Sequence, residues 1–246
     1  MLDEFLVAFE KYCIQENIIA EFSKLDPWDE YAKLVKVKLQ AEYYGNYFCN
    51  DLSIDFFHKE YNRRSKRAIK KAVEVGVTVD FDFEGKTINQ FLDLYKNTED
   101  KFQTSEYYIF SENDIKEYFT MFSGRCFFSN AYLNGEIITS VLSVLGEDIL
   151  HYLYLGTNPK FLDCQANSLL TYETSCLGQR MGRKVFDMGG GKLGGNIEQF
   201  KRNFISENGV IEYYAIKKIH NKEIYDYLVE HKERIENRKF FPEYRG

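Results

Sequence analysis

The sequence predicts a mixed α/β fold, that is, an α+β arrangement built on a mixed sheet. Two apolar runs at 126–146 enclose the pair Asn134-Gly135, which is typical of a type I′ hairpin turn. A helical period at 166–182 is followed by the short apolar strand KVFDM (184–188). This order is neither the strand–helix alternation of a dinucleotide-binding fold nor the repeat of a TIM barrel.

The first 86 residues predict helices and strands in alternation. Apolar residues recur with a helical period at 2–18, and KLVKVKLQ (33–40) alternates as a strand does. One or two helices cover 50–76, where Gly76 suits a C-cap. A strand follows at 77–83, and EGK then forms a turn.

The rest of the chain begins with two helices, at 87–102 and at 111–122, and the second can be capped by Ser111 or Asn113. The further elements expected after these helices are strands on both sides of Asn134-Gly135, a strand at 147–157, a helix at 166–182, strands at 184–188 and 209–218, a short helix or turn at 197–204 and a charged helix at 220–239.

Composition narrows the class of function. The 246-residue chain carries a formal net charge of −6, which argues against a nucleic-acid-binding domain, and we expect no DNA partner. Five cysteines and four histidines are scattered without the spacing of a metal site or a disulfide framework. With neither a secretory signal nor a run of ~20 apolar residues, we expect a soluble cytoplasmic protein without a metal.

The glycine-rich stretch VFDMGGGKLGGN (185–196) follows a predicted buried strand. It lacks the Gly-Lys-Ser/Thr ending of a phosphate-binding loop. Gly189, Gly191 and Gly194 have the GxGxxG spacing of a dinucleotide-binding fingerprint, but they are three of five glycines in this stretch, so the match is weak. A mobile loop is a second interpretation. The third is that bare backbone lets a ligand or a neighbouring chain segment come close.

Two other stretches allow both a structural and a functional interpretation. The segment 152–173 leads from a strand through a crossover to a helix start, which can bind a pyrophosphate but is common to many folds. The basic run NRRSKRAIKKAVEVG (62–76) is a solvated amphipathic helix or, less simply, an anion site. His151 fits a packed position in an aromatic strand better than a general base.

In their order along the chain, several blocks resemble the FemABX family and its acetyltransferase relatives on the GNAT fold. The blocks are NIIAEFSKLDP (17–27), DLS with NRRSKRAIKKAVEVGVTV (51–79), FLDLYKNTEDKF with YYIF (91–110), HYLYLGTNPKFLDCQANSLLTYE (151–173), and VFDMGGG with FKRNF (185–204). The resemblance implies tandem GNAT-like lobes: an incomplete first lobe at 1–83, on which the helix at 220–246 packs, and a second lobe at 84–219.

The resemblance also implies an acyltransferase, with Lys201 and Phe200 facing the reacting carbonyl. Lys201 would stabilise the developing oxyanion. The donor would lie against the crossover, at Gly156, Thr157, Gln165, Ala166, Asn167 and Ser168. The substrate would contact Tyr152, Tyr154, Gly189, Gly190, Gly191, Lys101 and Arg202.

By the same resemblance, the donor is acetyl-CoA or another acyl-CoA, or an aminoacyl-tRNA. The acceptor is an amine of a cell-envelope or sugar-linked precursor, such as a membrane-linked peptidoglycan (cell-wall) intermediate. Lys101 stands where the family has Arg, which keeps the charge but not the bidentate geometry. The acidic charge favours a CoA donor over tRNA. A non-catalytic GNAT-like binding protein and a nucleotide-hydrolysing enzyme are the alternatives.

Overall fold

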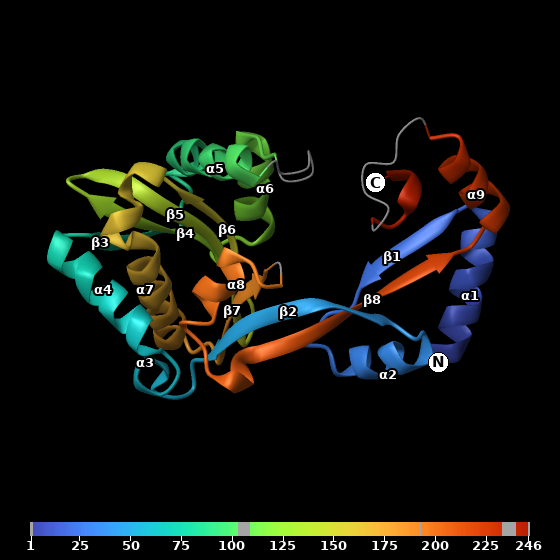
Figure 1. Cartoon of the computed structure of the whole chain (residues 1–246), viewed down its shortest axis with the longest axis horizontal. Helices are drawn as coiled ribbons and strands as arrows, with labels where there is room; N and C mark the ends of the chain where they lie inside the picture. Colours follow the sequence, from blue (N-terminus) through green and yellow to red (C-terminus); the bar gives the residue numbers. More distant parts are fainter. Residues whose placement is uncertain (1, 103–108, 192, 233–239, 246) are drawn as a thin grey trace. The chain divides into compact units, whose positions relative to one another are not determined.

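The computed structural model describes residues 2–102, 109–191, 193–232 and 240–245, with the side chains of residue 30 and residues 97–102 excepted. The chain divides into two compact units (Figure 1). The terminal unit consists of 1–46 and 212–246, and the central unit of 47–211. The lobes expected at 1–83 and 84–219 stay a prediction, because compactness alone does not define a GNAT lobe.

The terminal unit combines a small antiparallel sheet with short helices. Strand β1 pairs antiparallel with β8, from Ala20 opposite Ile219 to Lys24 opposite Ala215. In this sheet the ring of Tyr213 covers Gly45, where a Cβ would come within 2.9 Å of the ring. The elements of this unit are α1 (Leu2–Gln15), β1 (Ala20–Lys24), α2 (Glu30–Lys38), the first half of β2 (Glu42–Asp51), most of β8 (Val210–Ile219), α9 (Lys222–Glu230) and η4 (Glu243–Arg245).

The strand expected at 33–40 is wrong, because this segment forms helix α2. Asp29 caps the helix by accepting a hydrogen bond from the backbone N–H of Tyr31 at 2.9 Å. Lys36 and Lys38 in its last turn suit the negative end of the helix dipole. The apolar residues of this segment alternate as in a strand, but the cap and the charges favour a helix.

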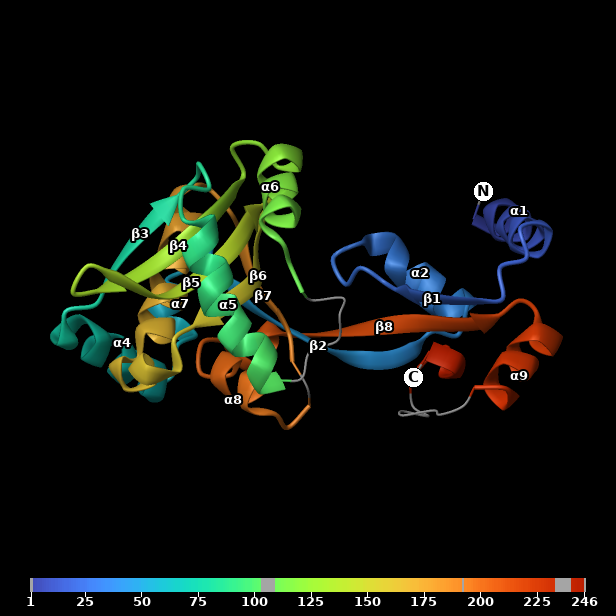
Figure 2. The same cartoon turned by 90° about the horizontal axis from the view of Figure 1, so that it is seen from above.

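The central unit is a mixed sheet with helices on both faces. Its strands lie in the order β2-β7-β6-β5-β4-β3, and only the β6–β7 pair among the described pairings in this unit is parallel. Figures 1 and 2 show α4 and α7 on one face and α5 and α6 on the other. The elements are α3 (Phe56–Lys59), α4 (Arg63–Val75), β3 (Thr78–Asp82), α5 (Ile88–Phe102), α6 (Glu112–Met121), β4 (Cys126–Leu133), β5 (Glu136–Leu145), β6 (Ile149–Thr157), η2 (Pro159–Cys164), α7 (Ala166–Arg180), β7 (Val185–Gly190), α8 (Asn196–Lys201) and η3 (Glu207–Gly209).

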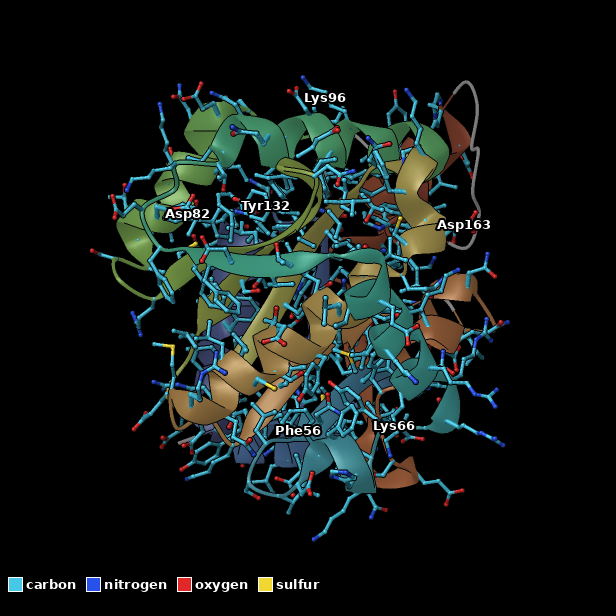
Figure 3. All side chains as sticks on the ribbon, turned by 90° about the vertical axis from the view of Figure 1, so that its left-hand side faces the viewer. Phe56, Lys66, Asp82, Lys96, Tyr132 and Asp163 are labelled. Carbon is cyan, nitrogen blue, oxygen red and sulfur yellow. The ribbon has the colours of Figure 1, made fainter. Side chains whose placement is uncertain are left out.

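Each face of the sheet carries its own apolar core. Phe127, Leu150 and Phe186 pack with α4 and α7 on one face, whereas Phe91 and Phe128 belong to the core under α5 and α6. Burying such side chains stabilises a fold by about 1.5–3 kcal/mol each, so two cores hold the sheet rigid on both sides. Figure 3 shows the side chains of this unit on the ribbon, with Phe56 and Lys66 labelled near α3 and α4.

The local signals of this unit are confirmed. Asn134 and Gly135 both have positive φ angles, of 52° and 82°, as a type I′ turn requires. Gly76 ends α4 in the left-handed conformation, and Ser111 caps α6 through a capping box. The mixed α/β class is therefore confirmed as well.

Strand β6 contains a bulge at Leu153. Leu142 of β5 lies opposite Tyr154, but the next residue, Ser143, lies opposite Tyr152, so Leu153 has no partner across the strands. The bulge reverses the alternation of the strand. Tyr152 and Leu155 consequently face the α7 core, while Tyr154 faces the α5 core.

Strands β6 and β7 pair only over three rows, from Ile149 opposite Val185 to His151 opposite Asp187. Both strands continue beyond that point, β6 to Thr157 and β7 to Gly190. The two parallel strands therefore part after His151, within the central unit and before β6 reaches the crossover that leads into α7.

Candidate active site

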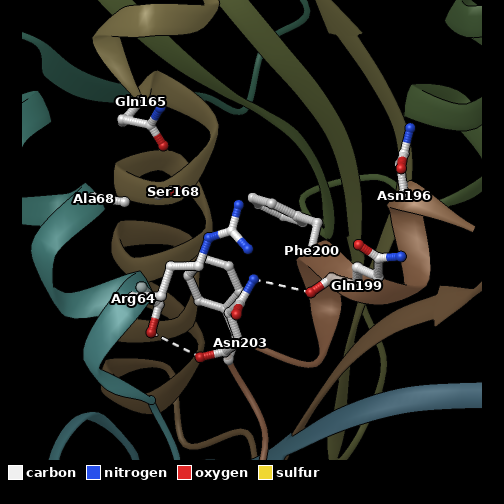
Figure 4. A pocket seen from close by; sticks show the side chains of 10 residues that line it. Arg64, Ala68, Gln165, Ser168, Asn196, Gln199, Phe200 and Asn203 are labelled. Carbon is white, nitrogen blue, oxygen red and sulfur yellow. Dashed lines mark hydrogen bonds between the residues drawn. The ribbon is translucent and has the colours of Figure 1, made fainter.

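A cavity of about 240 Å³ opens at the start of α7 (Figure 4). It lies between three helices, because α4, the first turn of α7 and the α8 segment all contribute to its wall. The lining residues are Arg64, Ser65 and Ala68 from α4, Gln165 and Ser168 from α7, and Asn196, Gln199, Phe200, Asn203 and Phe204 from α8 and the turn after it.

The first turn of α7 is open toward this cavity. Gln165 precedes the helix in the left-handed conformation, with φ 58°, and no side chain caps the helix. By contrast, Asn62 caps α4 through the amides of Arg64 and Ser65. A non-glycine residue at positive φ is strained, and uncapped amides at a helix start attract anions. This end of α7 therefore offers an anion-binding surface.

Arg64 adds a positive charge to the same cavity. Its guanidinium points into the space between α7 and Phe200 in Figure 4, and it forms no hydrogen bond or ion pair with the described residues. Two other cations of α4 are engaged, because Lys66 donates to the carbonyl of His58 and Lys70 lies 3.6 Å from Glu74. Arg64 is the α4 cation that lines the cavity.

The crossover residues expected to bind a donor fall into two groups. Gln165 and Ser168 line the cavity. Thr157 instead donates to Asn167 Oδ1 at 3.1 Å, which ties the end of β6 to α7. Ala166 is buried in the first turn of the helix. The donor-binding role of these residues stays a prediction.

Gly156 is small for a structural reason. A Cβ at this position would lie 2.6 Å from the backbone nitrogen of Tyr95 and 2.8 Å from the carbonyl carbon of Leu94. Helix α5 therefore packs with its backbone directly against β6. The carbonyl of Gly156 accepts a hydrogen bond from Thr139 at 3.0 Å.

Lys201 lies at the end of β7. Its Nζ donates to the carbonyl oxygen of Gly190 at 2.6 Å. It also lies 3.8 Å from the position that a Cβ of Gly189 would occupy, and that position is 3.9 Å from the carbonyl of Tyr152. The ammonium therefore sits beside the place where β6 and β7 part. Burial lowers the pKa of Lys201 to about 8, although Asp187 acts in the opposite direction.

Phe200 and Lys201 face different surroundings although they are neighbours in the chain. Phe200 lines the cavity and packs on Phe204 with ring centroids 4.9 Å apart. Since α8 separates the two side chains, the expected Phe-Lys pair lies along two sides of one short helix, with Phe200 toward the cavity and Lys201 toward β7.

The two tyrosines expected to bind substrate lie on opposite faces of the sheet. Tyr152 packs on Phe186 on the α7 face, and burial raises the pKa of its hydroxyl. Tyr154 lies on the α5 face, where its hydroxyl is 3.2 Å from that of Tyr118. Only Tyr152 is thus on the side of the cavity.

The remaining expected residues belong to the glycine-rich segment and its flanks. Arg202 forms an ion pair with Glu198 at 2.7 Å. Glu198 also accepts from the N–H of Gly194, which holds the glycine segment on α8. A Cβ on Gly191 would come within 3.3 Å of the N of Glu198, which agrees with the interpretation that a neighbouring backbone comes close. The side chain of Lys101 lies outside the described residues.

Sequence reasoning did not select Asp187, Asn196, Gln199 or Asn203, and it left Arg64 within a basic run. Asp187 precedes Gly189 by two residues, a spacing that signals an Asx turn and could have been used. No local signal identifies the other lining residues, because they meet only through tertiary packing.

No group of three or more His, Cys, Asp or Glu side chains in the described ranges is arranged to hold a metal ion. Among the helices that the structure describes, none combines the length and the apolar character needed to cross a bilayer.

Comparison with protein families gives one match, to a family described as an acetyltransferase (GNAT) domain, over residues 59–202. The match covers more than half of the chain and contains the crossover, Lys201 and the residues that line the cavity, except Asn203 and Phe204. No curated protein sequence matches the chain.

Solved structures similar to the chain share its fold at low sequence identity. FemX superposes with a TM-score of 0.69 at 13% identity, over 92% of this chain and 78% of FemX. A tandem GNAT protein from the clavulanic acid biosynthesis pathway has a TM-score of 0.54 at 10% identity, over 86% and 67% of the two chains. L-PGS from Bacillus licheniformis gives 0.52 at 13% identity, over 87% and 66%. These likenesses concern the fold, and the expected GNAT fold is confirmed.

Proposed function

Because the chain belongs to the FemABX-like family of GNAT acetyltransferases, we propose that it transfers an acyl group from acyl-CoA directly to an amine of a cell-envelope or sugar-linked precursor. Acyl transfer is the activity of the family as a whole. The donor and the acceptor are the specific parts of the proposal. The observation that carries it is the position of the Lys201 ammonium beside the parting of β6 and β7.

The donor's phosphates would bind at the start of α7. Its uncapped amides and the free guanidinium of Arg64 together offer hydrogen bonds and positive charge to an anion. The acyl arm would run from there between β6 and β7. The parting of the two strands supports this path, since it leaves the backbone of β6 beyond His151 without a partner in β7.

Lys201 would act on the reacting carbonyl. The amine of the acceptor attacks the thioester carbon and the carbonyl oxygen becomes an oxyanion. The C–S bond then breaks, CoA leaves as the thiolate, and the amine proton passes to solvent. An ammonium held by Gly190 O at 2.6 Å is in place before the charge develops, which is the arrangement that stabilises an oxyanion most effectively.

An aminoacyl-tRNA is the second donor that the site could take. Arg63 and Arg67 are also exposed on α4 and would contact phosphates beyond the cavity. The resemblance of the sequence to the FemABX family implies this donor, whereas the net charge of −6 favours the smaller one. A binding protein without catalysis is the alternative to both donors.

The test is isothermal titration calorimetry of the full chain with acetyl-CoA and, separately, with a short aminoacyl-tRNA mimic. We expect acetyl-CoA to bind and to be consumed when an amino sugar or a peptide-linked lysine is added. Binding of the mimic alone would assign the tRNA donor. Binding without turnover on any amine would favour the non-catalytic alternative, and absence of both binding events would overturn the proposal.

A further inference from the structure

Asp187 is a buried carboxylate at the centre of three adjacent strands. The residue is 5% exposed and lies opposite Cys49 of β2 on one side and His151 of β6 on the other. Its Oδ2 lies 3.2 Å from His151 Nδ1, and the thiol of Cys49 donates to Oδ1 at 3.8 Å. A buried carboxylate is costly unless its oxygens are bonded, so its position calls for an explanation.

The same carboxylate shapes the end of β7. Asp187 Oδ1 accepts a hydrogen bond from the N–H of Gly189 at 2.7 Å, which closes an Asx turn. Gly189 has φ +71°, a conformation that only glycine adopts at low cost. The turn directs the next carbonyl, that of Gly190, at Lys201 Nζ.

Few other groups among the described residues could place a negative charge near Lys201. Glu198 is on the same helix, but it is already bonded to Arg202 and to the Gly194 amide. Cys49 faces Lys201 from β2, and burial together with Asp187 raises the pKa of its thiol, so the thiol is neutral. His151 faces the pair from β6 through Asp187. The carboxylate that opposes the ammonium is therefore that of Asp187.

We propose that Asp187 is a positioning residue for Lys201: its carboxylate fixes the turn that presents Gly190 to the ammonium and supplies negative charge on the same side of that turn. His151 and Cys49 hold the carboxylate in the required orientation. The catalytic consequence rests on the proposed function, but the link between Asp187 and Lys201 does not.

The direct experiment is the NMR titration of 13C-labelled lysine in the full chain, with the Lys201 signal assigned by its loss in Lys201→Met. Asp187→Asn retains an oxygen for the Gly189 amide but removes the charge. We expect the Lys201 midpoint, near pH 8 in the parent, to fall by about one unit or more in Asp187→Asn. Asp148→Asn is the matched control, because it makes the same change at a carboxylate that pairs with Lys184 instead, and should leave the midpoint unmoved.

A measurement on the parent protein covers the case in which Asp187→Asn does not fold. The 13Cγ signal of Asp187 should show a step near the Lys201 midpoint, and the step should be lost in Lys201→Met. An Asp187 signal that is flat across this pH range, or an Asp187→Asn midpoint equal to the parent's, overturns the inference.

The kinetic arm separates this inference from the proposed function. If the chain transfers acyl groups, the high-pH limb of kcat should move to lower pH in Asp187→Asn, which a merely structural role would not cause. If no transfer is found but the NMR midpoint moves, the proposed function fails and the role of Asp187 toward Lys201 stands.

Discussion

The two ends of the candidate site carry positive charge in opposite ways. At the cavity, the Arg64 guanidinium is exposed and forms no bond with the described residues. At the end of β7, the Lys201 ammonium is largely buried, bonded to Gly190 and opposed by Asp187. The Arg64 charge is therefore solvated in the free protein, whereas the Lys201 charge is already held in a fixed position.

The difference indicates a division of labour between binding and chemistry. An exposed cation contributes modestly and is screened by salt, which suits a donor that must enter and leave. A buried cation costs stability, but it needs no rearrangement when charge develops on a carbonyl. Substitutions at each end of the site can therefore separate binding from chemistry.

Replacing Lys201 by Met should have the largest effect on activity. Loss of a fixed oxyanion-stabilising group lowers kcat by about 10²–10³-fold. Steady-state kinetics with acetyl-CoA would measure this, with the donor dissociation constant from calorimetry as the control. Full activity in Lys201→Met would show that the buried charge does not contribute to the chemistry.

The same substitution should stabilise the fold. Removing a buried ammonium should raise the free energy of unfolding at pH 7 by about 1–2 kcal/mol, after allowance for the lost bond to Gly190. The pKa of Lys201 is lower in the folded chain, about 8, than the unfolded value of ~10.4. The unfolded parent therefore binds more protons between these values, and parent stability rises with pH. In urea unfolding, the free energy of unfolding of Lys201→Met should exceed that of the parent most below pH 8, and the difference should vanish near pH 10.

Alanine at Gly189 and at Gly194 gives a matched pair. Both glycines have positive φ, 71° and 73°, so each substitution should cost about 1–2 kcal/mol of stability. Only Gly189 neighbours Lys201, whereas a Cβ at Gly194 would meet open space. Thermal unfolding should therefore show a similar loss of stability in both variants, whereas kcat should fall further in Gly189→Ala than in Gly194→Ala. Equal losses of kcat would remove the argument for the turn at Gly189.

The smallest effect is expected at Arg64. Arg64→Ala should weaken donor binding about tenfold, or ~1.4 kcal/mol, at low salt. The loss should shrink toward 0.5 M salt, because the cation is exposed. Lys70→Ala removes a cation from the same helix that already faces Glu74, and should leave the dissociation constant unchanged. If the loss of donor affinity in Arg64→Ala did not depend on salt, the Arg64 side chain would not act as an exposed cation.

The fold was more predictable than the site, for physical reasons. The turn at Asn134-Gly135 and the caps at Gly76 and Ser111 depend on a few neighbouring residues, so the sequence identifies them. The segment 33–40 shows the limit, because a short apolar alternation also fits a helix once Asp29 caps it. Strands β1 and β2 were both missed, and the helical segment expected at 50–76 begins too early, because Asn50 and Asp51 belong to the end of β2.

The site depends on contacts between distant segments. The resemblance to the FemABX family indicated Lys201, but not the register that places Asp187 and Cys49 on neighbouring strands. Arg64 is one of several similar cations in the sequence, and only packing of α4 beside α7 distinguishes it. Such relations are set by tertiary structure, which a single sequence does not display.

The unpaired residue in β6 has a consequence for how this chain tolerates insertions and deletions. Removal of Leu153 alone would restore a regular ladder and leave Tyr154 opposite Leu142, so the residues that follow would keep their faces. Removal of the paired Leu155 would instead turn Gly156 and Thr157 to the opposite face, and the backbone that accommodates α5 at Gly156 would be turned away. We therefore expect a deletion in this strand to be tolerated at Leu153 and not at Leu155.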